Sequence, residues 1–206
     1  MNKISILIAD DHKIVRMGLK SLFAAEKDLS VVGEADDGEL AVQLAFKLSP
    51  DVIIMDLMMP KKDGVAATAE IHAKLPKTKI VVLTSYSTSD TIAAALSAGA
   101  SGAIMKSADD SMLLTAVRTV ATGKRFISPE VKGLLAFDPP APALSPRQQE
   151  VLVSLAKGFN NTEIANQLGI SKTVAKEHVE TLLVKLDAAN RTEAVAIAIR
   201  KQLVKT

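Results

Sequence analysis

Short apolar runs alternate with longer amphipathic stretches over the first 124 residues. The apolar runs are typical of strands buried on both faces, and they predict strands at 4–9, 31–35, 52–55, 80–83 and 102–105. The stretches between them have apolar residues at helical spacing and predict helices at 12–25, 38–47, 64–74, 90–98 and 110–122. Strands that alternate with helices in this way predict an α/β fold with a five-stranded, doubly wound parallel sheet.

The pattern breaks after residue 124. The stretch "FDPPAPALSP" contains four prolines in ten residues, which makes it too stiff and too poor in backbone donors to continue a helix or a central strand. We therefore expect a first domain over 1–124, a linker over 125–143 and a second domain over 144–206. The second domain is expected to be small and all-α, with helices at 145–156, 162–169, 171–186 and 192–204.

Composition narrows the class of protein. A chain of 206 residues with 48% apolar residues can bury a substantial core, and the absence of cysteine excludes disulfides and thiolate chemistry. The apolar span 4–9 is too short for a signal peptide, and no run approaches the ~20 apolar residues of a membrane span. We therefore expect a cytoplasmic location.

The net charge of +2 is unevenly spread, with −1 over residues 1–124 and +3 over residues 125–206. This slight asymmetry permits a nucleic-acid partner for the second domain without establishing one.

Polar residues follow the ends of four predicted strands. Asp10 and Asp11 follow the first, Asp56 ends the third within "DVIIMDLMMPKKDG", Thr84 follows the fourth and Lys106 follows the fifth. Ligands of such sheets gather at the carboxyl ends of the strands. Three converging carboxylates would repel one another, and a hard divalent cation with oxygen ligands resolves that repulsion. The sequence therefore predicts a Mg²⁺ site.

The predicted site also has the parts that phosphoryl transfer requires, with Asp56 as the nucleophile. Each residue alone has a simpler interpretation, since an aspartate after a strand commonly forms a turn or caps a helix. Their placement on four strand ends favours the functional interpretation. The chain has no dinucleotide-binding or P-loop glycine motif, and no second aspartate two residues after Asp56, which argues against an aspartyl phosphatase.

The segments "IADDH", "DVIIMDLMMPKKDG", "VVLTS" and "GASGAIMK" resemble the receiver domain of two-component response regulators. The resemblance implies a flavodoxin-like sheet with strand order 2-1-3-4-5. It also implies Asp56 as phosphoacceptor, Thr84 as the hydroxyl that meets the phosphoryl group and Lys106 as the phosphate-binding lysine. The implied Mg²⁺ ligands are Asp10, Asp11, Asp56 and the backbone carbonyl of Met58.

One position departs from that family. An aromatic residue commonly stands three positions before the lysine and rotates inward on phosphorylation, but this chain has Ala103 there. Tyr86 is the only tyrosine and could take over part of that role, although an exposed loop tyrosine is the simpler interpretation.

The second domain has a helix-turn-helix pattern. The segment 162–168 is followed by a turn at Gly169 and a helix that begins after Ser171. One face of that helix is an apolar stripe, formed by Ala175, Val179, Leu182, Leu183 and Leu186. A solvated surface is the simpler interpretation of the polar residues on its other side, and DNA reading is the functional one.

Residues 144–200 resemble the LuxR-type helix-turn-helix of NarL/FixJ-type response regulators, with Val174 replacing a usual threonine. Because a recognition helix enters the major groove with the side opposite its apolar stripe, we expect DNA contacts by Thr173, Lys176, Glu177, His178, Glu180 and Lys185. In the last helix, Val195, Ala198, Ile199 and Leu203 are expected to face the core, which leaves Ile197 as a candidate dimer contact.

Together the two domains predict a phosphorylation-controlled transcriptional regulator. A partner histidine kinase would donate a phosphoryl group to Asp56, and the protein would then dimerise and bind double-stranded DNA. It would not be an enzyme beyond promoting its own phosphorylation and dephosphorylation. The alternative is a phosphorylation-independent DNA-binding regulator that uses a degenerate receiver as an interaction module, which only Ala103 favours.

Overall fold

A parallel sheet forms the centre of the first of two units into which the chain divides, Met1–Pro139 and Pro140–Thr206. The computed structural model describes residues 3–85, 88–201 and 203–204. The strands are β1 (Ile4–Ala9), β2 (Leu29–Ala35), β3 (Val52–Asp56), β4 (Lys79–Thr84), β5 (Gly102–Met105) and β6 (Phe126–Ile127). Their order is β2-β1-β3-β4-β5-β6, and every neighbouring pair is parallel.

The predicted parallel sheet is confirmed, but its predicted number of strands is wrong. The short strand β6 adds to the edge of β5, where Phe126 pairs with Gly102 and Ile127 with Ala103. Two residues are too few to show a strand pattern in the sequence. Every residue of β3 is buried, as its continuous apolar run predicts for a strand covered on both faces.

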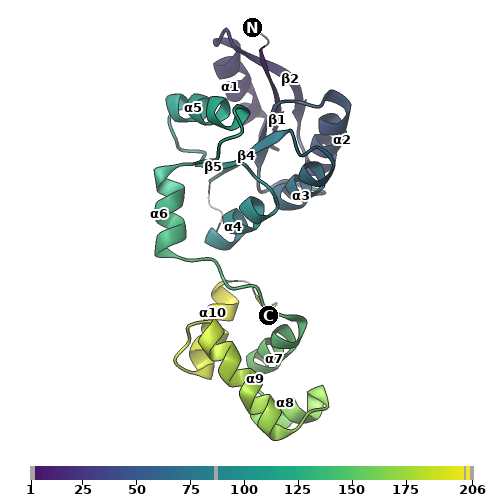
Figure 1. The fold of residues 1–206 in the computed structure, drawn as a ribbon, viewed down its shortest axis with the longest axis vertical. Helices are drawn as coiled ribbons and strands as arrows, with labels where there is room; N and C mark the ends of the chain where they lie inside the picture. Colours follow the sequence, from purple (N-terminus) through teal and green to yellow (C-terminus); the bar gives the residue numbers. More distant parts are fainter. Residues whose placement is uncertain (1–2, 86–87, 202, 205–206) are drawn as a thin grey trace. The chain divides into compact units, whose positions relative to one another are not determined.

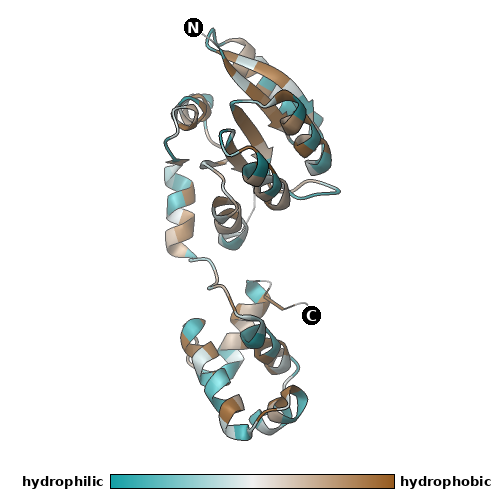
Figure 2. Cartoon of the chain, turned by 45° about the vertical axis from the view of Figure 1, so that its right-hand side comes forward, coloured by the Kyte–Doolittle hydropathy of each residue, from teal (hydrophilic) through white to brown (hydrophobic). Residues whose placement is uncertain are grey.

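Helices cover both faces of the sheet (Figure 1). They are α1 (Lys13–Ala24), α2 (Gly38–Leu48), α3 (Gly64–Lys74), α4 (Ser89–Ser97) and α5 (Asp110–Ala121). Helices α2, α3 and α4 bury one core with the sheet, whereas α1 and α5 bury a second core on the other face. Figure 2 shows the strands as largely hydrophobic and several helices as hydrophilic on one side. The site residues are thus fixed at the ends of strands packed from both sides.

The segment 125–143, predicted as a linker, is instead structured as far as residue 137. It contains β6 and a helix, α6 (Pro129–Phe137). The Ser128 side chain caps α6 by accepting a hydrogen bond from the Val131 amide, and Pro129 occupies the first turn, where a missing N–H costs nothing. Val131 is fully buried in the core beside α2, α3 and α4. The proline-rich stretch therefore begins beyond α6, and the helix belongs to the first unit.

Four helices, as predicted, form the described part of the second unit: α7 (Pro146–Ala156), α8 (Asn161–Leu168), α9 (Lys172–Lys185) and α10 (Arg191–Arg200). Gly169 closes α8 in the left-handed conformation at φ 64°, and the Ser171 side chain caps α9. These residues make the predicted helix-turn-helix. In α10 the prediction is wrong for two residues. Ile199, expected to face the core, is 48% exposed, whereas Ile197, expected as a dimer contact, packs against the core. Among the described residues, every helix falls short in length or apolar character of a membrane crossing.

Candidate functional site

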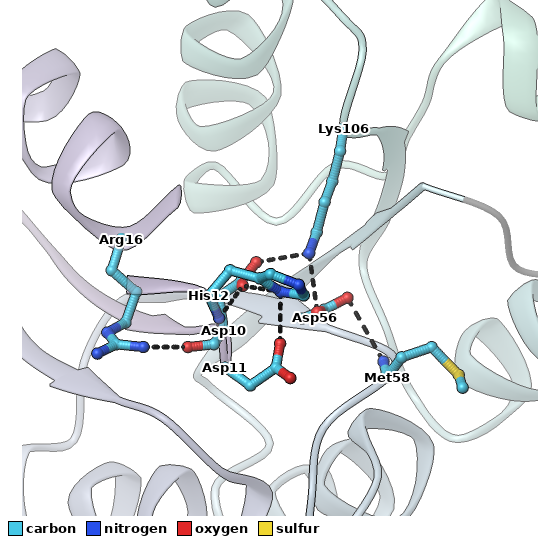
Figure 3. Close-up of polar contacts among 7 residues, drawn as sticks. All are labelled: Asp10, Asp11, His12, Arg16, Asp56, Met58 and Lys106. Carbon is cyan, nitrogen blue, oxygen red and sulfur yellow. Dashed lines mark hydrogen bonds and ion pairs between the residues drawn. The ribbon is translucent and has the colours of Figure 1, made fainter. Parts of the chain in front are cut away.

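The carboxyl ends of neighbouring strands bring together residues that are far apart in the sequence. Ala9 pairs with Met55 between β1 and β3, so that Asp10 lies beside Asp56. Lys106 follows β5, and its side chain reaches between the two aspartates (Figure 3). The sheet therefore gathers a cation and two carboxylates at one edge.

Lys106 joins the two aspartates through its ammonium group. Its Nζ lies 2.7 Å from Asp10 Oδ2 and 2.8 Å from Asp56 Oδ2, and the three side chains are only 15%, 2% and 4% exposed. Burial raises the pKa of Asp56, although the ammonium of Lys106 opposes that rise. Burial alone would lower the pKa of Lys106, but the two carboxylates raise it overall. The site thus holds a charged lysine between two closely packed acidic groups.

Asp11 adds a third carboxylate at the solvent side of the pair. Its Oδ1 lies 2.6 Å from His12 Nδ1, which is also 3.3 Å from Asp10 Oδ1. Ligand atoms of Asp10, Asp11, His12 and Asp56 all lie within 4.8 Å of one another. The sequence prediction omitted His12, and its position directly after the aspartate pair was the only indication that it lies here.

The donor set fits a hard divalent cation such as Mg²⁺. Three carboxylates supply oxygen ligands, and the one ammonium between them balances only part of their charge. Asp10 Oδ2 is buried and already lies 2.7 Å from the Lys106 ammonium, so the fit to a cation rests on the oxygen-rich donor set and its excess negative charge.

Hydrogen bonds fix the orientation of the aspartates (Figure 3). Asp10 Oδ1 accepts from the His12 amide at 2.9 Å, and the Asp10 carbonyl accepts from Arg16 Nη1 at 2.7 Å. Asp56 Oδ1 accepts from the Met58 amide at 3.4 Å. The structure thus shows Met58 approaching Asp56 through its N–H group, whereas the predicted metal contact would use its carbonyl.

Thr84 lies at the same edge of the sheet. It is the last residue of β4, it is fully buried, and its carbonyl accepts from the Lys106 amide at 2.8 Å. Ala103 is fully buried within β5 between Val82 and Ile127. Tyr86 lies outside the described residues.

The predicted DNA-contacting residues of α9 lie on its outer side. Five of the six are exposed and His178 is half-buried, while Ala175, Val179 and Leu182 are buried against the rest of the unit. Lys176 Nζ lies 3.6 Å from Glu180 Oε1, and Lys185 Nζ donates to Gln148 Oε1 of α7 at 2.9 Å. The outer surface of α9 is therefore available for contacts.

Comparisons with known proteins match each of the two units to a protein family. Residues 6–118 match the response regulator receiver domain, and residues 142–198 match the bacterial regulatory proteins of the luxR family. The chain is 37% identical to the transcriptional regulatory protein LiaR of Bacillus subtilis, over 98% of this chain and 99% of that protein.

Solved structures are similar over nearly the whole chain. An RcsB response regulator of Salmonella typhimurium is 30% identical with a TM-score of 0.75, covering 94% of this chain and 98% of that one. A complex of RcsB with DNA is 29% identical with a TM-score of 0.69, covering 97% and 99%. The chain therefore belongs to the two-component response regulators that combine a receiver domain with a LuxR-type DNA-binding domain, and it is a transcriptional regulator rather than a classical enzyme.

Proposed function

We propose that Asp56 accepts a phosphoryl group from a partner sensor histidine kinase and that phosphorylation changes dimerisation and DNA binding. The observation that carries this proposal is the Lys106 ammonium, which lies within 2.8 Å of Asp56 and beside three clustered carboxylates. A buried nucleophilic carboxylate next to a fixed cation is the arrangement that phosphoryl transfer uses.

The reaction is a displacement at phosphorus. A carboxylate oxygen of Asp56 forms a bond to phosphorus while the bond from phosphorus to the imidazole nitrogen of the kinase's phosphohistidine breaks. The nitrogen keeps the electron pair of that bond, and the product is an acyl phosphate on Asp56. Lys106 would then exchange its ion pair with the free carboxylate for contacts to the phosphoryl oxygens, since a lysine ammonium binds phosphate as a point charge. The receiver would also promote hydrolysis of the acyl phosphate with the same groups: water would attack phosphorus, the bond from phosphorus to the Asp56 oxygen would break, and inorganic phosphate would leave.

Asp10, Asp11, Asp56 and the Met58 carbonyl are the residues that would hold Mg²⁺. When bound, the ion supplies charge neutralisation of the transferred oxygens. Thr84 ends β4 at the same edge and is proposed to meet the phosphoryl group with its hydroxyl. Because Ala103 has no ring to rotate inward, we propose that switching depends on Thr84 and the loop after it.

The second unit would read DNA through α9. A recognition helix enters the major groove with its N-terminal half, and here that half exposes Thr173, Lys176 and Glu177. Further along the helix, His178 and Glu180 are proposed as base contacts and Lys185 as a phosphate contact. RcsB has been solved as dimers on DNA, which supports a dimer for this chain. A regulator that binds DNA in this way would act in the cytoplasm.

Ala103 favours a second candidate, a regulator that binds DNA independently of phosphorylation. Incubation with Mg²⁺ and acetyl phosphate separates the two possibilities at the chemical step. The proposal predicts an acid-stable, base-labile phosphoprotein whose label maps to Asp56 and is lost in Asp56→Asn. A protein that stays unlabelled under these conditions would favour the second candidate.

A further inference from the structure

The loop that joins β3 to α3, residues 57–63, contains a residue in an unfavourable backbone conformation. Lys61 has φ 62°, in the left-handed region where glycine is the favoured residue and an L side chain is strained. The same loop carries Met58 at its start, next to Asp56. A strained position near a site raises the question of what its side chain does there.

The Lys61 side chain forms an ion pair with the start of α2. Its Nζ lies 2.5 Å from Asp37 Oδ2, and Asp37 is only 4% exposed. The other carboxylate oxygen of Asp37 accepts from the Leu40 amide at 2.8 Å and so caps α2. The ion pair holds the pKa of Asp37 below its usual range and that of Lys61 above it. The Lys61 ammonium of the loop is thus paired with a buried carboxylate that the start of α2 holds in a fixed orientation.

The backbone of the same loop meets α2 at close range. A Cβ added at Gly38 would lie 2.0 Å from the Lys62 carbonyl oxygen, and one added at Gly64 would lie 2.0 Å from the Asp56 carbonyl oxygen. Both glycines therefore permit approaches that any side chain would prevent. Helices α2 and α3 are neighbours on one face of the sheet (Figure 1). The loop is fixed at one end to β3 and in its second half to α2.

We propose that Lys61, Asp37 and Gly38 are positioning residues for phosphoryl transfer to Asp56, because they form a latch that holds the β3–α3 loop, and with it the Met58 backbone, in place beside the acidic cluster. The latch touches neither the phosphoryl group nor the metal and acts through the loop. This inference rests on the proposed phosphorylation of Asp56.

The test uses two variants of the full chain that separate the latch from stability. Lys61→Gly removes an ammonium whose side chain is 62% exposed and relieves the left-handed backbone, so the loss of the ion pair and the relief of strain should largely offset each other in the thermal midpoint. Asp37→Asn removes the charge and keeps a side chain that caps helices as well as aspartate does. Lys62→Gln is the matched control, because it removes a lysine of the same loop that pairs with Glu70 of α3 instead.

Three quantities would be measured: the rate of phosphorylation by acetyl phosphate, the Mg²⁺ dissociation constant by calorimetry, and the thermal midpoint. The latch predicts that Lys61→Gly and Asp37→Asn each slow phosphorylation and weaken Mg²⁺ binding by about tenfold, as loss of supporting contacts around a metal site does. It also predicts that their combination costs no more than either alone, and that Lys62→Gln stays close to wild type.

Two results would overturn the inference. In the first, Mg²⁺ affinity and phosphorylation stay within about twofold of wild type in both variants, although loss of supporting contacts should cost more than that. In the second, the thermal midpoint collapses in both variants, which would show that the ion pair serves only the stability of the fold. Failure of the wild type itself to become phosphorylated would instead refute the proposed function, and the Mg²⁺ titration would still decide on the latch.

Discussion

Replacing Lys106 by methionine would remove the ammonium between Asp10 and Asp56 while keeping most of the apolar stem. At the observed separations of 2.7 and 2.8 Å, each ion pair has a gross attraction of about 6 kcal/mol at an effective dielectric constant of 20. Burying the ammonium costs several kcal/mol, which the variant recovers. Removing one partner from a buried ion pair typically costs about 3–5 kcal/mol net, and we expect a loss of stability in that range.

The loss should depend on pH and on Mg²⁺. Burial already raises the pKa of Asp56 and Lys106 opposes that rise, so the variant should have a still higher Asp56 pKa. The cost is therefore largest at a pH above the raised pKa, where Asp56 is ionised, and it shrinks as the pH falls through that pKa and the carboxyl is protonated. Mg²⁺ should stabilise the variant more than the wild type, because the cation then has no competing ammonium.

Hydrogen exchange of β1 and β3 amides measures the opening free energy of the first unit by itself. Lys124→Met is the control, because Lys124 is an exposed lysine of the same unit and its loss should change stability by less than about 0.5 kcal/mol. The electrostatic account of the site would be refuted by two results together. Lys106→Met would lower the opening free energy at neutral pH by less than about 1 kcal/mol, as is typical of a surface pair, and Mg²⁺ would protect the variant's amides no more than those of the wild type.

Two further predictions concern the metal and the DNA. Asp11→Ala should abolish Mg²⁺ binding and phosphorylation together, because Asp11, the most exposed of the three carboxylates, is expected to share the cation directly with Asp56. Calorimetric titration and labelling measure the two losses, and a variant that is still phosphorylated would exclude Asp11 as a ligand. Glu180→Ala should raise affinity for random DNA, because it removes a negative charge near the phosphates, and should lower discrimination at one base pair by ~1–3 kcal/mol. Binding to single-base operator variants measures both effects, and unchanged relative affinities would place Glu180 in solvent.

The sequence predicted the parts of the fold that have strong periodicity. The run 52–55 is buried on both sides, and the ends of β1, β3 and β5 place Asp10, Asp56 and Lys106 together as expected. It failed where elements are short or where several prolines obscure the pattern, as for β6 and α6. The start of α6 depends on Ser128 and Pro129, which also occur commonly in turns.

Side-chain direction was harder to predict than the elements. Ile197 and Ile199 are two residues apart, and the helical phase of α10 was set by the small residues Ala194 and Ala198, both fully buried. Small buried residues contribute little to an apolar pattern, so the predicted face, although it includes Ala198, follows the larger Val195, Ile199 and Leu203. The latch between Lys61 and Asp37 joins residues 24 positions apart, and only the packing of α2 against the loop makes it visible.

A phosphoryl group on Asp56 is expected to change DNA binding by the second unit. The most direct measurement is the dissociation constant for a DNA sequence selected from a random pool, with and without acetyl phosphate and Mg²⁺, for wild type and Asp56→Asn. We predict that phosphorylation tightens binding by the wild type by about 5- to 150-fold, the usual range of coupling between two sites, and leaves Asp56→Asn unchanged. Equal affinities for the unmodified and the fully phosphorylated wild type would contradict the claim.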